Sequence, residues 1–402
     1  MTQKLTPAMQ QYYELKAQNP DAILWFRMWD FYEMFDDDAH IAHKVLGINV
    51  TTRNKNAENP QPLAGIPFHA KDKYLPQLVN AWYKVAIAEQ VSDPKAKWIV
   101  QREIVRVITP ATLNLEGESY SDENANFIVA IVEENERFWI SILDPSSWKW
   151  KTWELQDFEK LQTELYKIAP KEVILEKRLF SRADLKDVLE KKYNLNIYYF
   201  ELKNNAKQTL QNHFWLKDLT WLNLEKNELA VKASALILEY LESVQKTNLD
   251  YLNSISYETF SEFMDLDEST IRSLDLLYNF ASKSSKLWTL FWVMDKTKTA
   301  MWRRFLRESI VKPLQDVDEI KKRHNIIEEF SKDPVLLDKV VIQLKNVADL
   351  DNILTRLALW RANSRDLLAL KNSLKVVLEV FEFIKKSDNE RLVELLEINQ
   401  KS

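Results

Sequence analysis

The chain has 402 residues, a net charge of −5, 46% apolar and 29% charged residues, and no cysteine. This composition excludes a disordered chain, and the lack of cysteine excludes disulfides and metal–thiolate sites. No apolar run reaches the roughly 18 residues of a membrane-spanning helix, so we expect a folded cytoplasmic protein without a membrane partner.

The first part of the chain predicts a small mixed α/β domain, residues 1–113. Short apolar runs predict strands, and apolar residues at three- and four-residue spacing predict helices. Thr6-Pro7 is typical of a helix start, with a capping residue followed by proline in the first turn. The expected helices are 8–18, 33–44 and 74–82, and the expected strands are 23–28, 45–52, 84–89 and 104–108.

A polar, acidic linker at residues 114–126 separates this domain from two others. Strands alternate with helices over residues 127–228, which predicts a second α/β domain with a largely parallel sheet. The expected strands there are 127–133, 137–143, 172–175 and 196–200, with helices at 155–168 and 181–192. Long amphipathic helices without glycine follow over residues 229–402, which predicts an all-α domain.

The chain contains fourteen tryptophans and three glycines, the reverse of ordinary usage. Average usage of about 7% predicts roughly 28 glycines in a chain of this length. Glycine serves positions where the backbone angle φ is positive or where two backbones approach closely, and tryptophan suits neither. Either the protein is unusually aromatic, or several of these positions are not tryptophan in the living protein.

The segment Phe26–Phe35 is the strongest candidate for a binding site. An aromatic pair, Phe31 and Tyr32, directly precedes Glu33 at the expected strand-to-helix turn. One interpretation is structural, because Phe31 and Phe35 lie four residues apart and would form the buried face of the helix. The other interpretation is a functional site, and it rests on a resemblance.

Eight segments along the chain form long motifs: Ile23–Phe35, Thr51–Asn54, Pro62–Ala70, Tyr83–Pro94, Arg102–Leu113, Met264–Leu277, Thr289–Leu314 and Leu350–Leu374. These motifs resemble the MutS family of bacterial DNA mismatch repair proteins, in that family's order and spacing. The resemblance implies a mismatch-recognition domain (1–113), an RNase H-like connector domain (127–228) and an incomplete helical core and lever domain (229–402).

The family's Phe-x-Glu motif matches Phe31 and Glu33. The resemblance implies that Phe31 enters the base stack from the minor groove beside a mispaired or looped-out base, and that Glu33 bonds the displaced base. An apolar wedge of this kind kinks the duplex, at a cost that is lower where pairing is already defective. Arg53 and Lys55, in a polar turn, would contact phosphates. A solvated loop explains these two cations equally well.

The resemblance also sets expectations for cofactors and partners. In the family, the ATPase domain with its P-loop, the DNA clamp and the main dimer contacts lie beyond the position that matches residue 402. We therefore expect no catalytic residue, cofactor site or metal site in this chain, and ATP and Mg²⁺ only in a full-length, DNA-dependent ATPase. The expected partners are mismatched double-stranded DNA, a second copy through the C-terminal part, and a MutL-type repair protein.

Many tryptophans occupy positions where the MutS family has glycine. Independent mutations would not favour one replacement so consistently. We hypothesise that the source organism reads the codon UGA as glycine, whereas this sequence was translated with UGA as tryptophan. Trp25 does not match a family glycine. The matching positions are Trp29, Trp82, Trp98, Trp148, Trp215, Trp288, Trp292, Trp302 and Trp360, together with Trp139.

Three alternatives remain open at this point. Glycines in place of the tryptophans would make Ser146–Glu154 resemble a phosphate-binding P-loop, although Pro145 occupies the position of its first glycine. A metal-dependent nuclease would use Asp144 with Glu133 or Glu134, although two-metal chemistry needs several convergent carboxylates. A MutS paralogue without mismatch recognition usually lacks the Phe-x-Glu motif or the whole first domain, and both are present here.

Overall fold

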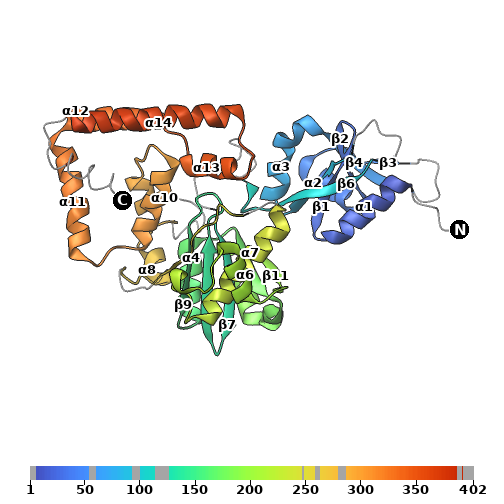
Figure 1. Cartoon of the computed structure of the whole chain (residues 1–402), viewed down its shortest axis with the longest axis horizontal. Helices are drawn as coiled ribbons and strands as arrows, with labels where there is room; N and C mark the ends of the chain where they lie inside the picture. The colour runs from blue at the N-terminus through green and yellow to red at the C-terminus, as the bar shows by residue number, and fades with distance from the viewer. Residues whose placement is uncertain are drawn as a thin grey trace.

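The computed structural model describes residues 6–53, 60–92, 100–113, 126–246, 249–258, 263–278, 287–386 and 392. In this part of the chain, two six-stranded mixed sheets and a group of long helices form three regions (Figure 1). The expected order of two α/β regions followed by a helical region is confirmed. No helix among these residues is long and apolar enough to cross a membrane.

The first sheet has the strand order β3-β4-β2-β1-β5-β6. Its centre is β1, which pairs antiparallel with β2 and parallel with β5. The expected strands 23–28, 84–89 and 104–108 are confirmed as β1, β5 and β6. The strands are β1 (Ala22–Met28), β2 (Phe31–Phe35), β3 (Thr51–Arg53), β4 (Gln61–Pro67), β5 (Lys84–Gln90) and β6 (Arg102–Ile108).

Helices cover both faces of this sheet. The helices α2 (Asp36–Leu46) and α3 (Lys71–Asn80) pack on one face, in a cluster that includes Trp25 and Tyr32. On the other face lies α1 (Pro7–Gln18), which begins as expected with the Thr6 hydroxyl accepting a hydrogen bond from the Met9 amide. The Tyr12 ring of α1 contacts the rings of two strand residues, with centroids 5.6 and 4.8 Å away.

The predicted helix 33–44 and strand 45–52 are partly wrong. Residues 31–35 form the strand β2, and the helix begins only at Asp36, where three consecutive aspartates occupy its first turn. Carboxylates are favourable there because they face the unpaired amides and the positive end of the helix dipole. The helix ends at Leu46 and is capped by Gly47, whose φ of 67° is the left-handed conformation that favours glycine.

The second sheet has the strand order β11-β10-β7-β8-β9-β12 and is mixed rather than largely parallel. The strands β7, β8 and β9 are antiparallel neighbours, because short turns join them and leave no room for a crossover helix. Parallel pairing flanks them on both sides. The strands are β7 (Ile128–Glu134), β8 (Arg137–Leu143), β9 (Trp150–Leu155), β10 (Glu172–Glu176), β11 (Asn196–Phe200) and β12 (Ser256–Tyr257).

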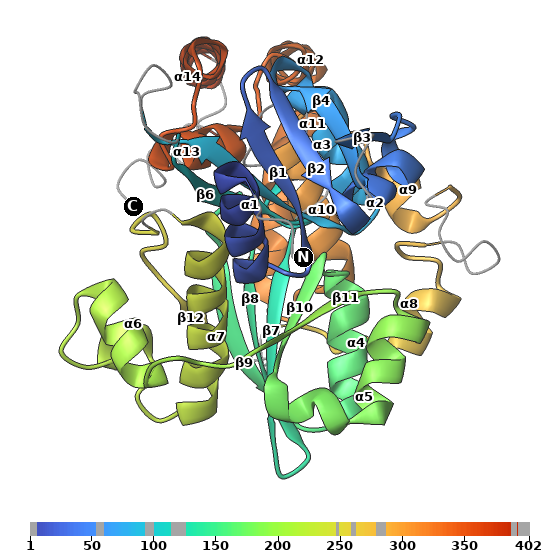
Figure 2. The same ribbon diagram turned by 90° about the vertical axis from the view of Figure 1, so that its right-hand side faces the viewer.

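Two helices sandwich the second sheet, as Figure 2 shows. The helix α4 (Phe158–Ile168) packs on one face and α7 (Glu228–Gln245) on the other. The sequence pattern assigns α7 to the third domain, whereas its buried residues join the core of the second sheet. The other helices of this region are α5 (Ala183–Asp187) and α6 (Ala206–Phe214), with a π-helical turn at Val188–Lys192.

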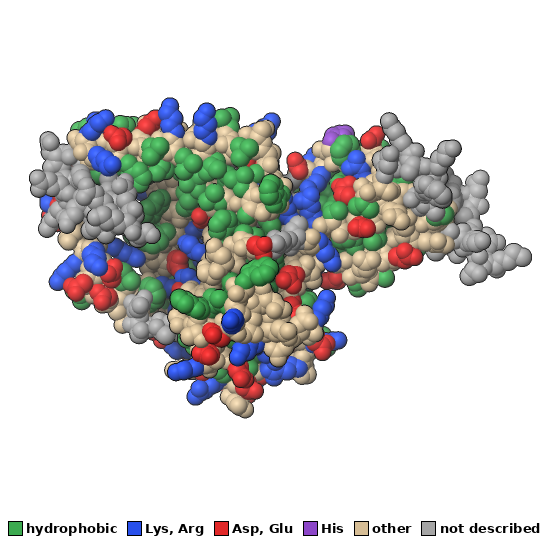
Figure 3. Space-filling model, viewed as in Figure 1, with side chains coloured by type: hydrophobic (Ala, Val, Ile, Leu, Met, Phe, Trp, Pro, Cys, Tyr) green, Lys and Arg blue, Asp and Glu red, His purple; other side chains and the backbone are tan. Residues whose placement is uncertain are grey.

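The helical region forms a frame on the side of the molecule opposite the first sheet (Figure 1). A buried ion pair between Arg356 and Asp366, 2.5 Å apart, ties two of its helices together. Apolar side chains gather over α13 and α14 on the face that Figure 3 shows. Exposed leucines of these helices include Leu354, Leu367 and Leu378. The helices are α8 (Glu268–Ser273), α9 (Leu290–Met294), α10 (Ala300–Val311), α11 (Val317–Lys332), α12 (Pro334–Leu344), α13 (Leu350–Ala358) and α14 (Ser364–Lys385).

Tryptophan occupies left-handed backbone positions. Among the described residues, fourteen that are not glycine have positive φ, and six of these are tryptophan, with φ between 55° and 70°. This conformation costs an L-residue about 1–2 kcal/mol, whereas glycine adopts it freely. All six are among the positions where the resemblance implies glycine, whereas Trp25, which is not among them, lies fully buried in β1. The backbone therefore supports the glycine hypothesis at Trp29, Trp82, Trp148, Trp215, Trp288 and Trp360.

Candidate nucleic-acid interface

The strand β2 starts at the end of the first sheet, directly after a tight turn at Trp29-Asp30. In the hairpin register, Met28 pairs with Phe31. On its other side β2 pairs with β4, which places Phe31 opposite Pro67. Phe31 thus lies at one end of a strand that is hydrogen-bonded on both edges, which fixes its backbone.

Side chains alternate between the two faces of β2. Tyr32 and Met34 point into the cluster under α2 and α3 and are buried. Phe31, Glu33 and Phe35 therefore share the opposite face, where α1 covers Phe35. The helix leaves the other end of the face open, so the side chain of Phe31 is 47% exposed. The structural interpretation of Phe31 as part of a buried helix face is wrong.

A glycine keeps the neighbouring strand from covering this open end. Gly65 of β4 pairs with Glu33, and paired residues project to the same face of a sheet. A Cβ atom built at Gly65 would lie 3.9 Å from Cγ of Glu33 and 4.0 Å from Cδ1 of Phe31. Any longer side chain there would extend over the two candidate residues.

Arg27 and Phe68 hold the turn that precedes Phe31. The Arg27 guanidinium lies over the ring of Phe68, 3.8 Å from its centroid, and within 4.0 Å of the Glu89 carboxylate. Its Nε donates to the Trp29 carbonyl at 2.5 Å, which ties the hairpin turn to the strand. The Phe68 amide donates to the Asp30 carbonyl at 2.9 Å. The turn before Phe31 is therefore held from two sides.

A second arginine lies near Glu33. Nε of Arg102 donates to the Arg27 carbonyl at 2.6 Å, and its guanidinium lies 4.8 Å from the centroid of the Phe26 ring. Burial lowers the pKa of Arg102, and the negative charge of the nearby Glu33 partly opposes that change. Burial also raises the pKa of Tyr32, and its hydrogen bond to Glu89 adds to that rise.

The other two predicted contact residues are separate from Phe31 and Glu33. The backbone of Arg53 belongs to β3 and pairs with Gln61, six residues along β4 from the residue opposite Phe31. At about 3.3 Å per residue this separates them by roughly 20 Å along the sheet. Lys55 and the side chain of Arg53 lie outside the described residues.

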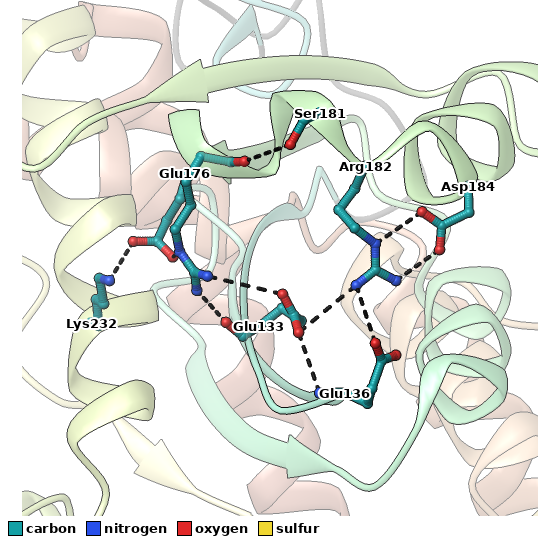
Figure 4. A network of polar contacts seen from close by, with 8 residues as sticks. Glu133, Glu136, Glu176, Ser181, Arg182, Asp184 and Lys232 are labelled. Atoms are coloured by element: carbon teal, nitrogen blue, oxygen red, sulfur yellow. Dashed lines mark hydrogen bonds and ion pairs between the residues drawn. The ribbon is translucent and has the colours of Figure 1, made fainter.

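The carboxylates of the nuclease alternative do not converge. Glu133 lies at the β7–β8 turn, and Asp144 follows the opposite end of β8, a separation of roughly 20 Å along the hairpin. The Glu133 carboxylate lies within 4.0 Å of Arg178 and Arg182, in a network with Glu176 and Lys232 (Figure 4). Among the described residues no group of three or more potential ligands could hold a metal ion.

The P-loop alternative also lacks its structural context. A phosphate-binding loop leads into a helix, whose first amides face the phosphates. Here the turn after Asp144 leads into the strand β9, and the Asp144 carboxylate itself accepts bonds from the Ser146 amide and the Ser147 hydroxyl. Trp150 is buried in this strand and donates to the Ser141 hydroxyl at 2.8 Å.

Sequence reasoning missed several residues that shape the site: Arg27, Gly65, Phe68 and Arg102. All four lie inside the motifs that resemble the family, and Gly65 carried a further signal because it is one of only three glycines in the chain. Phe68 and Arg102 reach the site through pairing of strands that are far apart in sequence. No local pattern carries that information.

Comparison with known proteins matches all three regions to one family. Family models match residues 6–116 as MutS domain I, 126–253 as MutS domain II and 269–401 as MutS domain III. Proteins named DNA mismatch repair protein MutS from Lachnoclostridium phytofermentans and Methanosarcina acetivorans are each 36% identical, over 93% and 99% of this chain. A protein of the same name from Streptococcus agalactiae is 36% identical over 93%.

The chain covers 40%, 48% and 42% of these three relatives, so it spans less than half of their length. The matched segments keep the order of domains I, II and III. Phe31 and Glu33 lie within the segment that matches MutS domain I. The chain belongs to the MutS family.

Proposed function

We propose that this chain recognises mispaired or looped-out bases in duplex DNA, as part of DNA mismatch repair, by inserting Phe31 into the base stack from the minor groove. One observation carries the proposal. Phe31 is 47% exposed at the open end of β2, on a strand whose backbone is paired on both edges.

The geometry suits a wedge because the ring is exposed and its support is rigid. Inserting an apolar side chain unstacks a base step at a cost of about a few kcal/mol. A flexible loop would lose part of the binding energy in becoming ordered. Phe31 avoids that loss, since Arg27 and Phe68 hold the preceding turn. The remaining cost is smaller at a mispaired base, and this difference is the source of discrimination.

Glu33 adds selectivity on the same face. A carboxylate is repelled by the phosphates of an intact duplex, and it gains only where an exposed base edge donates a hydrogen bond. It therefore penalises matched DNA more than a mismatch. The nearby Arg102 offsets part of the repulsion. Phosphate contacts by Arg53 and Lys55 also belong to the proposal and would position the duplex.

The proposal extends to the rest of the assembly that the family resemblance implies. An RNase H-like second domain is supported by the mixed sheet with helices on both faces. Binding of a second copy and of a MutL-type protein, and the use of ATP and Mg²⁺ by a longer protein, stay predictions.

Equilibrium binding to labelled duplexes tests the proposal. We expect the 402-residue chain to bind a duplex with one G·T pair or one unpaired base more tightly than the matched duplex. Phe31→Ala should weaken mismatch binding about tenfold or more, equivalent to ~1.4 kcal/mol, because the wedge contact is lost. Binding to the matched duplex should change little, since phosphate contacts dominate it.

The matched control is Phe180→Ala, which removes another exposed phenylalanine, 61% exposed and outside the first domain. This variant should keep wild-type discrimination. Equal binding of all duplexes by the wild type, or a Phe31→Ala variant that discriminates as well as the wild type, would contradict the proposal.

A further inference from the structure

A cavity of about 80 Å³ lies where the second sheet meets the helix α10. One wall comes from the β8–β9 turn, β9 and the end of α4, and includes Lys149, Lys151 and Lys167. The opposite wall comes from α10 and includes Arg304 and Arg307. The cavity therefore lies between two regions that match different domains of the family.

The wall of the cavity is strongly basic. Seven Lys and Arg side chains line it, against two carboxylates, Asp144 and Glu308. The remaining lining residues are one serine and six apolar residues, so few dipoles offset the positive charge. The basic residues are Lys149, Lys151, Lys167, Arg303, Arg304, Arg307 and Lys312.

Several of these cations are already paired with carboxylates that lie outside the lining. Arg304 forms a two-pronged pair with Asp349 at 2.7 and 2.9 Å. Lys151 and Lys312 share Glu258, at 2.5 and 3.4 Å. Lys151 also lies 3.3 Å from the lining carboxylate of Glu308. Arg303 and Lys167 form ion pairs with Asp295 and Glu164, at 2.9 Å each. Five of the seven cations are therefore already balanced by carboxylates, and the positive charge left over belongs to the other two.

Two of the cations have capacity for a further partner. Nη1 of Arg307 donates to the backbone carbonyl of Lys167 at 3.1 Å, and in the described part of the chain no carboxylate contacts this guanidinium. Lys149 likewise forms no ion pair with a described residue, and it lies exposed at the mouth of the cavity. An arginine has five N–H donors, so Arg307 can bind an anion without giving up its carbonyl bond.

We propose that this cavity binds a small tetrahedral oxyanion of the inorganic phosphate class, with Arg307 and Lys149 as its main ligands. The volume is several times the ~10–15 Å³ that one water needs on the same measure, so such an ion fits. It is well below the roughly 300 Å³ of the smallest pockets for drug-sized ligands, so a nucleotide does not. Arginine and lysine are the side chains that best complement phosphate oxygens.

A bound oxyanion would join the two regions. It would bridge Lys149 of the β8–β9 turn and Arg307 of α10, at a place where like charges otherwise face one another. The ion would therefore restrict movement of the helical region against the second sheet. This role is independent of DNA recognition, because the cavity lies between the second sheet and α10, whereas Phe31 belongs to β2 of the first sheet.

Isothermal titration with sodium phosphate, at constant ionic strength set with sodium chloride, tests the site. Arg307→Gln should weaken phosphate binding about tenfold, because a charged hydrogen bond is lost. Glu308→Gln should strengthen binding about threefold, because it removes a negative charge from the wall. Lys375→Ala removes an exposed cation of α14 that does not line the cavity, so it should leave binding unchanged.

The opposite signs of the two cavity variants make the experiment decisive. A general effect of net charge predicts that Arg307→Gln and Lys375→Ala behave alike, and that result would overturn the proposal. Absence of saturable phosphate binding to the folded wild type would also overturn it. So would a short single-stranded oligonucleotide that binds at this site while free phosphate does not. Circular dichroism spectra of each variant would confirm folding.

Discussion

Phe31 keeps about half of its side chain in water, although burial of a phenylalanine stabilises a fold by roughly 1.5–3 kcal/mol. A single exposed apolar residue is common on protein surfaces. The surroundings of Phe31 distinguish it, because Gly65 leaves the face open and a carboxylate, Glu33, shares that face. These neighbours favour a binding role over incidental exposure.

The sequence pattern does not determine the secondary structure around Phe31 or the exposure of its side chain. Phe31 and Phe35 are four apart, and this spacing places two residues on one face of a strand as well as on one face of a helix. The pattern therefore predicted correctly that the two residues share a face, but it predicted a helix where the structure has a strand. Exposure of Phe31 depends on where α1 ends its contact with the sheet, which is a tertiary property.

The left-handed tryptophans give a stability prediction. Trp360 is 97% exposed with φ of 57°, so its side chain contributes little packing and its backbone is strained. Trp360→Gly should raise the free energy of unfolding by about 1 kcal/mol, measured by urea denaturation. Trp221 is 86% exposed but does not have positive φ, so Trp221→Gly should lower it by roughly 0.5–1 kcal/mol.

An equal loss in both variants would contradict the glycine hypothesis for position 360. Peptide mass spectrometry of the protein from its natural source provides a direct check. Glycine is expected at positions 29 and 360, and tryptophan found at either position would exclude the altered reading of UGA there.

At the scale of elements, continuous apolar runs made β1, β5, β7 and β10 predictable from sequence. Such runs are typical of strands buried on both faces. The strand β2 was missed because the acidic residues that follow it resemble the first turn of a helix, and three of them do begin α2. The mixed second sheet was missed because pattern alone does not give the direction of pairing.

Glu172 gives a prediction about how elements of different regions are joined. It is fully buried at the start of β10, and its carboxylate accepts bonds from the Ala111 amide and the Tyr240 hydroxyl, both at 2.7 Å. Burial and this carboxylate raise the pKa of Tyr240. Glu172→Ala should lower the free energy of unfolding by about 2–4 kcal/mol, because both donors lose their acceptor in a buried place.

Glu172→Gln is the matched variant, since its amide oxygen can still accept the Ala111 bond. It should cost less than half as much as Glu172→Ala in the same urea titration. If the two substitutions cost the same, the carboxylate does not join the regions through these bonds.

At the scale of the whole molecule, sequence predicted the order of the three regions, and the comparisons place domains I, II and III in that order. The position of α7 was not predictable. Most residues of this helix are buried, and an apolar pattern does not show whether the helix packs on the second sheet or on the helices that follow it. The site residues Phe68 and Arg102 were equally hidden, because strand pairing across the first sheet brings them to the turn.

Unstacking of a base by Phe31 is the central step of the proposed function, and it can be measured directly. A duplex with 2-aminopurine beside a G·T pair reports it, because this base fluoresces more strongly when it is unstacked. At saturating protein the wild type and Phe180→Ala should raise the fluorescence with the mismatched duplex but not with the matched one, and Phe31→Ala should not raise it. An equal rise with Phe31→Ala, or no rise with the wild type at full binding, would contradict the account.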